Sequence, residues 1–539
     1  MAVILSIVIF LPLAGALLCA FLPGNEPTQH RGVALTFSLA ALFVSLALWF
    51  GFDASAAAPE FQFETKLPWI SSLGIGYHVG LDGVALLLLM LTTALTPIVI
   101  LSTFTAVTER VKEFMIALLV LEPAMIGTFA ALDLVLFYVF WEAMLVPMYL
   151  LIGIWGSENR LYATVKFFLY TFVASVLMLV AIIYVSVQAG GTFDYVTVRQ
   201  SLHVAPGAQA WLFLAFAVAF AVKVPMFPLH TWLPDAHTEA PTAGSVILAG
   251  VLLKMGTFGF FRYAMPLFPE AALRFRPAIA TLAVIGIVYG ALMSLVQKDM
   301  KRLVAYSSVS HLGFVMLGLM ALTAEGLTGG VYQMLNHGVS TGALFLLVGM
   351  LYERRHTRAI AEYGGIAKQV PWIATCFVIV TLSSVGLPGT NGFVGEFLIL
   401  SGTWLGRLPS AGFVSAVAAT GVILGAVYML LLVERVFFGK LDNEHNRHLP
   451  DLSLREVVVI APMLIAIAVM GLKPQPFLAP AKPSVDRLLA TFQAADDRLR
   501  LADPSRPQSV GTAPTELAGG LLDAPTGLLA PKARATETP

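Results

Sequence analysis

Seven ionisable side chains lie inside long apolar stretches of the sequence, and their chemistry suits the transfer of protons. Carboxylates, amines and imidazoles all take up and release protons, and burial disfavours the charged forms of lysine and glutamate, which brings their titration towards the range where histidine works. A charge near a bilayer centre costs at least about 2.5 kcal/mol, so each needs a partner, a water cavity or a function. The seven are Glu122, Glu142, Lys223, Lys254, His311, His337 and Glu396.

A second interpretation of these charges is that they form static ion pairs that hold helices together. Buried ion pairs seldom stabilise a protein relative to well-packed apolar residues. A single Glu and a single Lys would leave the two interpretations balanced, whereas titratable groups spread over many spans favour a proton relay.

Two of the seven residues stand beside a break in an apolar run. Lys223 precedes two prolines in AFAVKVPMFPLHTWLPDAH (219–237), and Glu396 ends the glycine-rich stretch SSVGLPGTNGFVGE (383–396). Proline removes a backbone donor, so carbonyls at such a break need water or a side-chain donor. A simple proline kink is the alternative for either segment. Two interrupted helices, each with an ionisable neighbour, are typical of transporters built from inverted repeats.

The composition predicts an all-α polytopic membrane protein. Of 539 residues, 58% are hydrophobic and only 12% are charged, against roughly 25% charged in soluble domains. The formal net charge of zero leaves no basic surface for nucleic acid, which is excluded as a partner. About fourteen transmembrane helices are expected, near residues 2–22, 32–52, 79–103, 114–131, 133–155, 162–188, 211–230, 241–264, 275–297, 302–323, 327–351, 370–402, 412–438 and 455–472.

The two breaks fall in the seventh and twelfth expected spans, and this spacing divides the chain. An offset of five spans reverses orientation, so two inverted five-helix repeats are expected. The expected units are spans 1–3 in 1–113, a first repeat in 114–264, a second repeat in 275–438, a last span in 455–472 and a polar, Pro-rich tail in 473–539. The tail holds ten of the 31 prolines and is predicted to be mostly flexible, with a weak helical pattern at 484–500.

Loop charges predict the orientation in the membrane. Loops after odd-numbered spans carry fifteen Lys and Arg residues, and loops after even-numbered spans carry six. Positive charges stay on the cytoplasmic side during insertion. Odd loops are therefore expected on the cytoplasmic face, and both termini on the opposite, periplasmic face.

No motif for redox or metal chemistry is found in the sequence. There is no Gly-rich phosphate loop after a strand, no CxxC pair and no nucleophile elbow. His230 and His237 stand seven residues apart at a span end, which is a poor spacing for a metal site and suits polar contacts along a water-filled route. No cofactor and no metal are expected in this chain.

Four stretches carry a resemblance to a known family. They are FYVFWEAMLVPMYLLIGIWG (137–156), KVPMFPLHTWLPDAHTEAPTAGSVILAGVLLKMGTFGFFR (223–262), DMKRLVAYSSVSHLGF (299–314) and GLPGTNGFVGEF (386–397). From about residue 1 to 472 the chain resembles the M-subunit family of bacterial NADH:quinone oxidoreductase, respiratory complex I, whose relatives include subunits of Mrp-type sodium/proton antiporters. The tail beyond residue 473 lies outside the resemblance.

The resemblance implies a role for each charged residue. Glu142 and Lys223 match the family's ion pair on the intake side, Lys254 its central lysine and Glu396 its terminal group on the exit side. His311 and His337 match histidines that help to carry protons towards Glu396, and Glu122 matches an acidic residue of span 4. Glutamate, in place of the lysine common at the terminal position, marks the M type.

The resemblance also implies a setting. The chain would be a subunit of a respiratory, proton-translocating enzyme in the bacterial inner membrane, beside two neighbouring antiporter-like subunits, with flavin, iron–sulfur clusters and quinone in partner subunits and no redox site of its own. Two alternatives stay open: an Mrp-type sodium/proton antiporter subunit, and a passive scaffold of a membrane arm.

Overall fold

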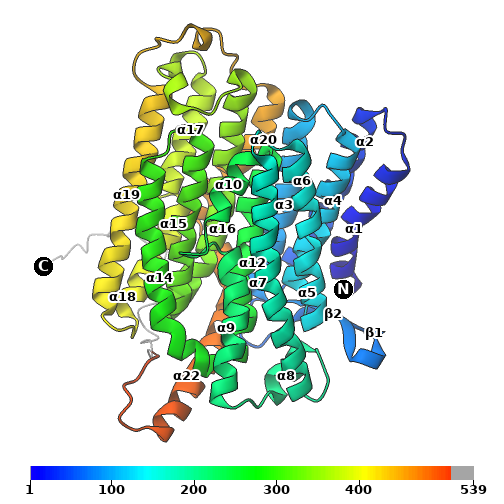
Figure 1. Ribbon diagram of the computed structural model, residues 1–539, viewed down its shortest axis with the longest axis vertical. Coiled ribbons are helices and arrows are strands. Elements are labelled where there is room, and N and C mark those ends of the chain that lie inside the picture. Colours follow the sequence, from blue (N-terminus) through cyan, green and yellow to red (C-terminus); the bar gives the residue numbers. More distant parts are fainter. Residues whose placement is uncertain (1, 511–539) are drawn as a thin grey trace, which may run out of the picture.

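Long apolar helices laid side by side along one axis make up most of the molecule (Figure 1). The computed structural model describes residues 2–510. In chain order its main elements are α1 (Ala2–Phe21), α2 (Pro27–Gly51), β1 (Gln62–Ile70), β2 (Ile75–Leu81), α3 (Gly83–Ala106), α4 (Val111–Ala130), α5 (Leu134–Ala143), α6 (Leu145–Trp155), α7 (Arg160–Gln188), α8 (Tyr195–Ser201), α9 (Pro206–Lys223), α10 (Trp232–Glu239), α11 (Thr242–Ile247), α12 (Leu253–Gly259), α13 (Met265–Leu267), α14 (Pro269–Leu295), α15 (Met300–Ala321), α16 (Ala324–Arg355), α17 (Pro371–Ser384), α18 (Asn391–Leu405), α19 (Ala411–Phe437), α20 (Leu454–Leu472), α21 (Gln475–Leu478) and α22 (Lys482–Ala502).

The all-α polytopic class predicted from composition is confirmed. Within residues 2–510, thirteen helical segments are long and apolar enough to cross a membrane. The predicted twelfth span, 370–402, is not among them because it is divided into α17 and α18. Within the seventh predicted span, 211–230, the helix α9 stops at Lys223, and the next helix, α10, begins at Trp232, just beyond the predicted end. Both predicted broken helices are therefore present; the count of fourteen and the inverted repeats stay predictions.

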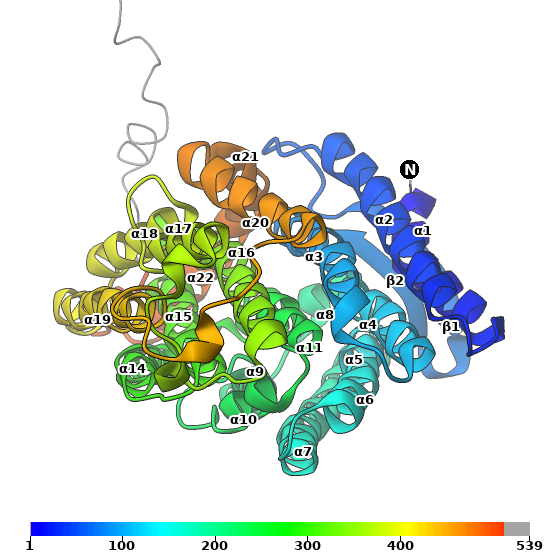
Figure 2. The ribbon, with the colours of Figure 1, turned by 90° about the horizontal axis from the view of Figure 1, so that it is seen from above.

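A few central helices are enclosed by the others. The apolar windows of α16 and of the segment Thr242–Leu267 are completely buried, and that of α15 is 94% buried, whereas α2 is only 28% buried. Seen from one end, α16 lies inside the molecule and α1, α2 and α19 lie at its edge (Figure 2). The outer apolar faces suit contact with lipid or with neighbouring membrane subunits.

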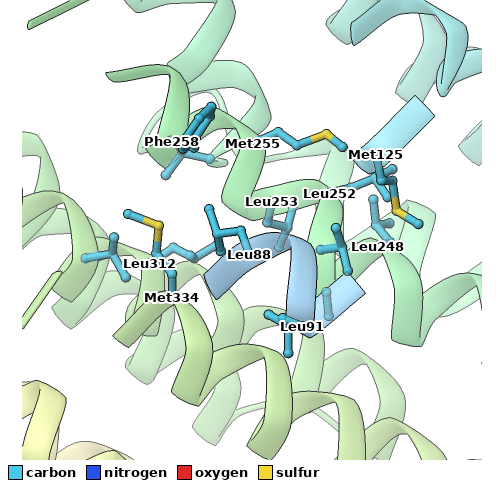
Figure 3. Packing of buried hydrophobic residues seen from close by; sticks show 14 of the residues in the cluster. Leu88, Leu91, Met125, Leu248, Leu252, Leu253, Met255, Phe258, Leu312 and Met334 are labelled. Atoms are coloured by element: carbon cyan, nitrogen blue, oxygen red, sulfur yellow. The ribbon is translucent and has the colours of Figure 1, made fainter. Parts of the chain in front are cut away.

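Apolar side chains pack tightly around the central segment Thr242–Leu267. Figure 3 shows Leu88 of α3, Met125 of α4, Leu312 of α15 and Met334 of α16 gathered around it, all of them buried. The segment itself is irregular, since π-helical turns at Leu248–Leu252 and Phe260–Ala264 flank α12. Single π-turns inside α-helices are frequent at functional sites, because they widen the helix and redirect its carbonyls.

A β-hairpin at one end of the molecule was not predicted. The expected third span began at residue 79, but Val79 belongs to β2, and α3 begins only after Asp82, whose side chain caps the helix by accepting a hydrogen bond from the Ala85 amide. β1 and β2 pair antiparallel, with Lys66 opposite His78. The sequence after residue 83 is strongly apolar, so the hydropathy pattern extends the predicted span back over the short strand that precedes it.

The hairpin is fastened to the helices through Asp194, in the connection before α8. The Asp194 carboxylate lies 2.7 Å from His78 Nδ1 and 2.8 Å from Lys66 Nζ. Burial alone would raise the pKa of Asp194, but hydrogen bonds from His78, Lys66 and Thr197 outweigh it and hold that pKa below its usual value. The charged carboxylate therefore stabilises the docked hairpin.

The first part of the expected flexible tail is helical. After α21, helix α22 covers the weakly periodic segment and lies against α14, α16 and α3. Its apolar stripe is buried, including Leu488 and Phe492, and Val510 beyond it is also buried. The average composition of residues 473–539 does not reveal this apolar stripe, because polar and proline residues outnumber its members. Residues 511–539 lie outside the described part of the chain.

Replacing Asp194 by Asn should loosen the hairpin. An acid whose folded pKa is lowered contributes stability above its unfolded pKa, near 4, and loses it as the pH falls further. Amide hydrogen exchange in residues 62–81 should therefore be faster in Asp194→Asn at neutral pH, and the difference from the parent should shrink below about pH 4. Asp53→Asn, a change at a solvent-exposed carboxylate, is the control and should leave the exchange unchanged.

Replacing Phe492 by Ala should release α22. Truncating a buried phenylalanine costs about 3–5 kcal/mol, and Phe492 is fully buried. Trypsin should then cleave at Arg498 or Arg500 faster than in the parent. Leu501→Ala is the matched control, since Leu501 is 84% exposed; equal cleavage of the two variants would show that the buried stripe does not hold the helix.

Candidate functional site

Helix α9 ends at Lys223 because the chain cannot continue as a helix through the prolines that follow. Pro225 and Pro228 have no amide hydrogen to donate to the preceding turn. The carbonyl of Val222 is instead satisfied by the indole Nε1 of Trp232, the first residue of α10, at 2.9 Å. The break is thus stabilised by a side chain from across the gap, and it leaves Lys223 at the helix end, inside the protein.

The Lys223 ammonium is buried without a hydrogen-bond acceptor. The side chain is 1% exposed, and Nζ has no partner among the described residues. It lies over the indole ring of Trp141 on α5, 4.8 Å from the ring centroid, a cation–π contact. Such a contact stabilises a cation without fixing it in a directional bond.

Glu142 follows Trp141 in the sequence and interacts electrostatically with Lys223. Both side chains lie in the described part of the chain, and they do not form an ion pair within 4 Å. Ser175 of α7 and Tyr138 of α5 lie within hydrogen-bonding reach of the Glu142 carboxyl group, while its Oε1 has no partner. The carboxylate is therefore near the lysine but held by neutral donors.

Lys254 lies between the two π-helical turns of the central segment. Its side chain is fully buried, and Nζ contacts both the Ala249 carbonyl and Nδ1 of His337, the latter at 2.6 Å. The acceptor carbonyl belongs to the first π-turn. Backbone irregularity and an imidazole from α16 together accommodate an amine that has no carboxylate beside it.

His337, His311 and Glu396 continue the line of titratable groups. The imidazole rings of His337 and His311 meet edge to face, with centroids 5.9 Å apart. His311 Nδ1 lies 3.3 Å from Glu396 Oε1, an ion-pair distance, and its Nε2 lies 3.3 Å from the Ser384 hydroxyl. Glu396 also accepts a hydrogen bond from the Gln333 amide at 3.2 Å.

Glu396 lies near the start of α18, and its carboxylate is beside the break between α17 and α18. Gly386 and Gly389 both have positive φ, 74° and 92°, which permits the tight turn. A Cβ on Gly386 would come within 2.7 Å of Glu396 Oε2, whereas a Cβ on Gly389 would meet nothing within 4 Å. Glycine at 386 therefore makes room for the carboxylate.

Six of the seven predicted residues lie in two groups of neighbours, a pair and a set of four, and together we call them the buried charged row. Its members in spatial order are Glu142, Lys223, Lys254, His337, His311 and Glu396. Lys223 and Lys254 are not in direct contact, but their helices pack closely, since a Cβ on Gly256 would lie 2.7 Å from the Phe220 carbonyl. Glu122 is fully buried in α4, and neither of its carboxylate oxygens has a hydrogen-bond partner within residues 2–510.

Several polar residues beside the row were not predicted. Trp141, Gln333 and Ser384 contact its members, and Asn336 donates to Gln333 Oε1 at 2.9 Å. Residues 333, 336 and 337 share a face of α16, a pattern of polar residues in an apolar helix that the sequence displays. His237, which was predicted to make polar contacts along a water-filled route, is completely buried, and both of its ring nitrogens are unpartnered in the described chain.

Three comparisons with known proteins agree on the family of this chain. The family model described as "NADH:quinone oxidoreductase/Mrp antiporter, TM" matches residues 131–424. The chain belongs to this family. NADH-quinone oxidoreductase subunit M of Rhodobacter capsulatus is 47% identical over 507 residues, covering 91% of this chain and 97% of the relative. The subunit M of Rickettsia prowazekii is 44% identical, with coverages of 91% and 99%.

A solved structure has the same fold. A chain of respiratory complex I from Thermus thermophilus with bound NADH superposes with a TM-score of 0.82 at 32% identity, over 91% of this chain and all of the other. The predicted resemblance to the M-subunit family is thereby confirmed. The assignment of roles to the charged residues stays a prediction, as does the expected lack of a metal or redox cofactor.

Replacing Gly386 by Ala should displace Glu396, because the added methyl group would meet its carboxylate. Gly389→Ala is the matched control: it places alanine at a positive φ in the same break but adds no contact. A cryo-electron microscopy map of the assembled complex should show the Glu396 carboxylate moved away from His311 in the first variant only. An unmoved carboxylate would contradict the spatial role of Gly386.

Proposed function

We propose that this chain is an M-type, proton-translocating membrane subunit of an NADH:quinone oxidoreductase. The buried charged row is the observation that carries the proposal. Its members come from both broken helices and from the fully enclosed helices at the centre of the molecule. The curated relatives at 47% and 44% identity are named as subunit M of that enzyme, and the similar solved chain is part of a respiratory complex I.

The geometry favours proton transfer over a static role for the row. A charge kept only to hold helices together would be fully paired, because an unpaired buried charge is costly. Lys223 Nζ has no acceptor, one oxygen of Glu142 has no donor, and Nε2 of His337 is also unpartnered among the described residues. Unfilled hydrogen-bonding positions along a line of titratable groups leave places for water and for protons in transit.

Glu142 and Lys223 supply an intake step. A carboxylate that approaches the amine favours its ammonium form, and withdrawal of the carboxylate favours release of the proton. At about 4 Å and an effective dielectric constant near 20, such a pair interacts by about 4 kcal/mol. The separation seen here, beyond ion-pair distance and with the amine over Trp141, corresponds to the withdrawn arrangement.

Lys254, the two histidines and Glu396 supply the onward path. A proton on Lys254 can pass to His337 at 2.6 Å, across the adjoining imidazole of His311 and on to Glu396. Glu396, beside the α17–α18 break, is the exit group in this scheme, and Glu122 is a further proton-binding carboxyl in α4. We propose no energy source within this chain. Quinone reduction in partner subunits would drive the proton transfer.

The enzyme setting and location belong to the same proposal. We place the chain in the bacterial inner membrane with both termini on the periplasmic side, beside two antiporter-like subunits, and without a flavin, iron–sulfur cluster or quinone of its own. An Mrp-type antiporter subunit is the second candidate, because the matched family includes such proteins. Co-purification without flavin or iron–sulfur subunits would favour that candidate.

Replacing Glu142 by Gln tests the proposal, because it keeps the shape of the side chain and removes its charge. NADH-driven proton translocation in membrane vesicles should fall strongly while the complex still assembles. Glu158→Gln makes the same chemical change at an exposed position and is the control. Unchanged pumping in an assembled Glu142→Gln complex would favour a passive scaffold.

A further inference from the structure

Aromatic rings lie between Lys223 and the end of the molecule that carries the β-hairpin. α5 starts at that end, because Asp133, the residue before it, bridges to Asp194 before α8, and α9 runs from the same end to Lys223 (Figure 1). This end is the one predicted to be periplasmic, since its loops follow even-numbered predicted spans. Six rings from α5, α8, α9 and the π-turn after α12 make up what we call the aromatic seal: Phe137, Trp141, Tyr195, Phe216, Phe220 and Tyr263.

The seal begins at the Lys223 ammonium. The Trp141 ring, which faces that ammonium, lies 5.4 Å from the ring of Phe220 and 5.6 Å from that of Phe137, centroid to centroid. Phe216, Phe220 and Lys223 are spaced four and three residues apart, so they share one face of α9. The lysine therefore faces aromatic rings on its hairpin side.

From Phe137 the rings continue to the hairpin. The centroids of Phe137 and Tyr263 are 4.3 Å apart, and those of Tyr263 and Tyr195 are 5.2 Å apart. Tyr195 directly follows Asp194, whose carboxylate contacts both strands of the hairpin. The seal thus reaches from the buried lysine to the docked hairpin.

The seal is closely packed, and its hydroxyl groups are already bonded. All six side chains are at most 1% exposed. A Cβ on Gly259 would lie 2.5 Å from the Phe220 ring, so the backbone of α12 packs directly on that ring. The hydroxyls of Tyr195 and Tyr263 both donate to backbone carbonyls. A buried water needs two to four polar partners, and these rings do not offer them.

The surroundings of Glu396, at the other end of the row, are polar instead. The Gln333 amide and the His311 imidazole lie against its carboxylate, and the Ser384 hydroxyl lies beside the imidazole. Polar side chains of this kind can hold water. The row therefore has polar groups around its Glu396 end and a closed layer of rings beside Lys223.

We propose that the aromatic seal is a proton barrier, which separates the Glu142–Lys223 pair from the hairpin end of the molecule and prevents a leak of protons through this half of the chain. This inference rests on the proposed function of the buried charged row. A proton taken up by Lys223 cannot pass straight to the hairpin end, because hydrocarbon rings neither bind protons nor hold the water that would carry them. The seal residues transfer no protons themselves; they keep the chain closed to passive proton flow.

Passive proton flow in the absence of NADH tests the barrier. The assembled complex is reconstituted in liposomes that contain a pH-sensitive dye, and a potassium diffusion potential is imposed. Phe137→Ser combined with Phe220→Ser leaves space and hydroxyls for water, so inward proton flow should be several-fold faster than in the parent; Phe137→Ser alone should give a smaller increase. Phe137→Leu with Phe220→Leu keeps the space apolar and should stay as tight as the parent. Parent-like flow in both serine variants would overturn the barrier.

Phe114→Ser is the matched control. Phe114 is also fully buried and packs on an aromatic ring, that of Trp155, but it lies near the start of α4, at the opposite end of the molecule. This variant should not leak, and a leak equal to that of the seal variants would show a general packing defect and overturn the proposal. Adding Glu142→Gln to the double serine variant should reduce its leak, since the path begins at the pair. An undiminished leak would show that the seal does not insulate the pair.

Pumping by the Glu142→Gln complex separates this inference from the proposed function. Normal NADH-driven translocation in Glu142→Gln alone would refute the function of the row itself. A loss of translocation in Glu142→Gln, together with parent-like passive flow in both serine variants, would refute the seal alone. A loss in Glu142→Gln and a leak in the serine variants that depends on Glu142 support an intake pair closed off from the hairpin end.

Discussion

The cost of holding charge inside apolar surroundings shapes the centre of this protein. Every amine, carboxylate and imidazole placed there must be offset by something other than bulk water. The structure offers three substitutes: an aromatic face for Lys223, a backbone carbonyl and an imidazole for Lys254, and an amide with a histidine for Glu396. None of the three neutralises its charge with a tight carboxylate–ammonium pair. These contacts offset part of the cost of burying the charges, and they leave each group free of a tight ion pair that would favour one protonation state.

Irregular backbone accompanies these charges, and at Lys254 it supplies a hydrogen-bond acceptor directly. In a regular helix each carbonyl already accepts a backbone hydrogen bond, so a broken or widened helix offers a buried polar group a freer backbone partner. α9 ends beside Lys223, the π-turn at Leu248–Leu252 presents a carbonyl to Lys254, and the glycine turn before α18 makes room for Glu396. Breaks or widened turns and charges therefore occur side by side at three places in the structure, and the sequence displays two of these pairs as prolines and glycines next to an ionisable residue.

Much of the fold could be predicted because hydropathy and proline placement act locally. The long apolar runs gave the spans, and Pro225 and Pro388 located the two breaks. The hairpin could not be read in the same way, because β2 runs directly into the apolar start of α3. The order of Glu142, Lys223 and Lys254 in space depends on packing between distant helices, and only the resemblance to a family supplied it. The contacts of Trp141 and Gln333 need side-chain geometry that no spacing encodes.

The Trp232 indole that caps Val222 has a mechanical consequence. It joins α10 to the last turn of α9, so a shift between the two half-helices would strip a buried carbonyl of its donor, at a cost of about 1–3 kcal/mol. The turn it protects carries Lys223, and the half-helix it belongs to carries His237. This hydrogen bond therefore couples the two halves of the broken helix: a movement of the Lys223 end without α10 costs about 1–3 kcal/mol more than a joint movement.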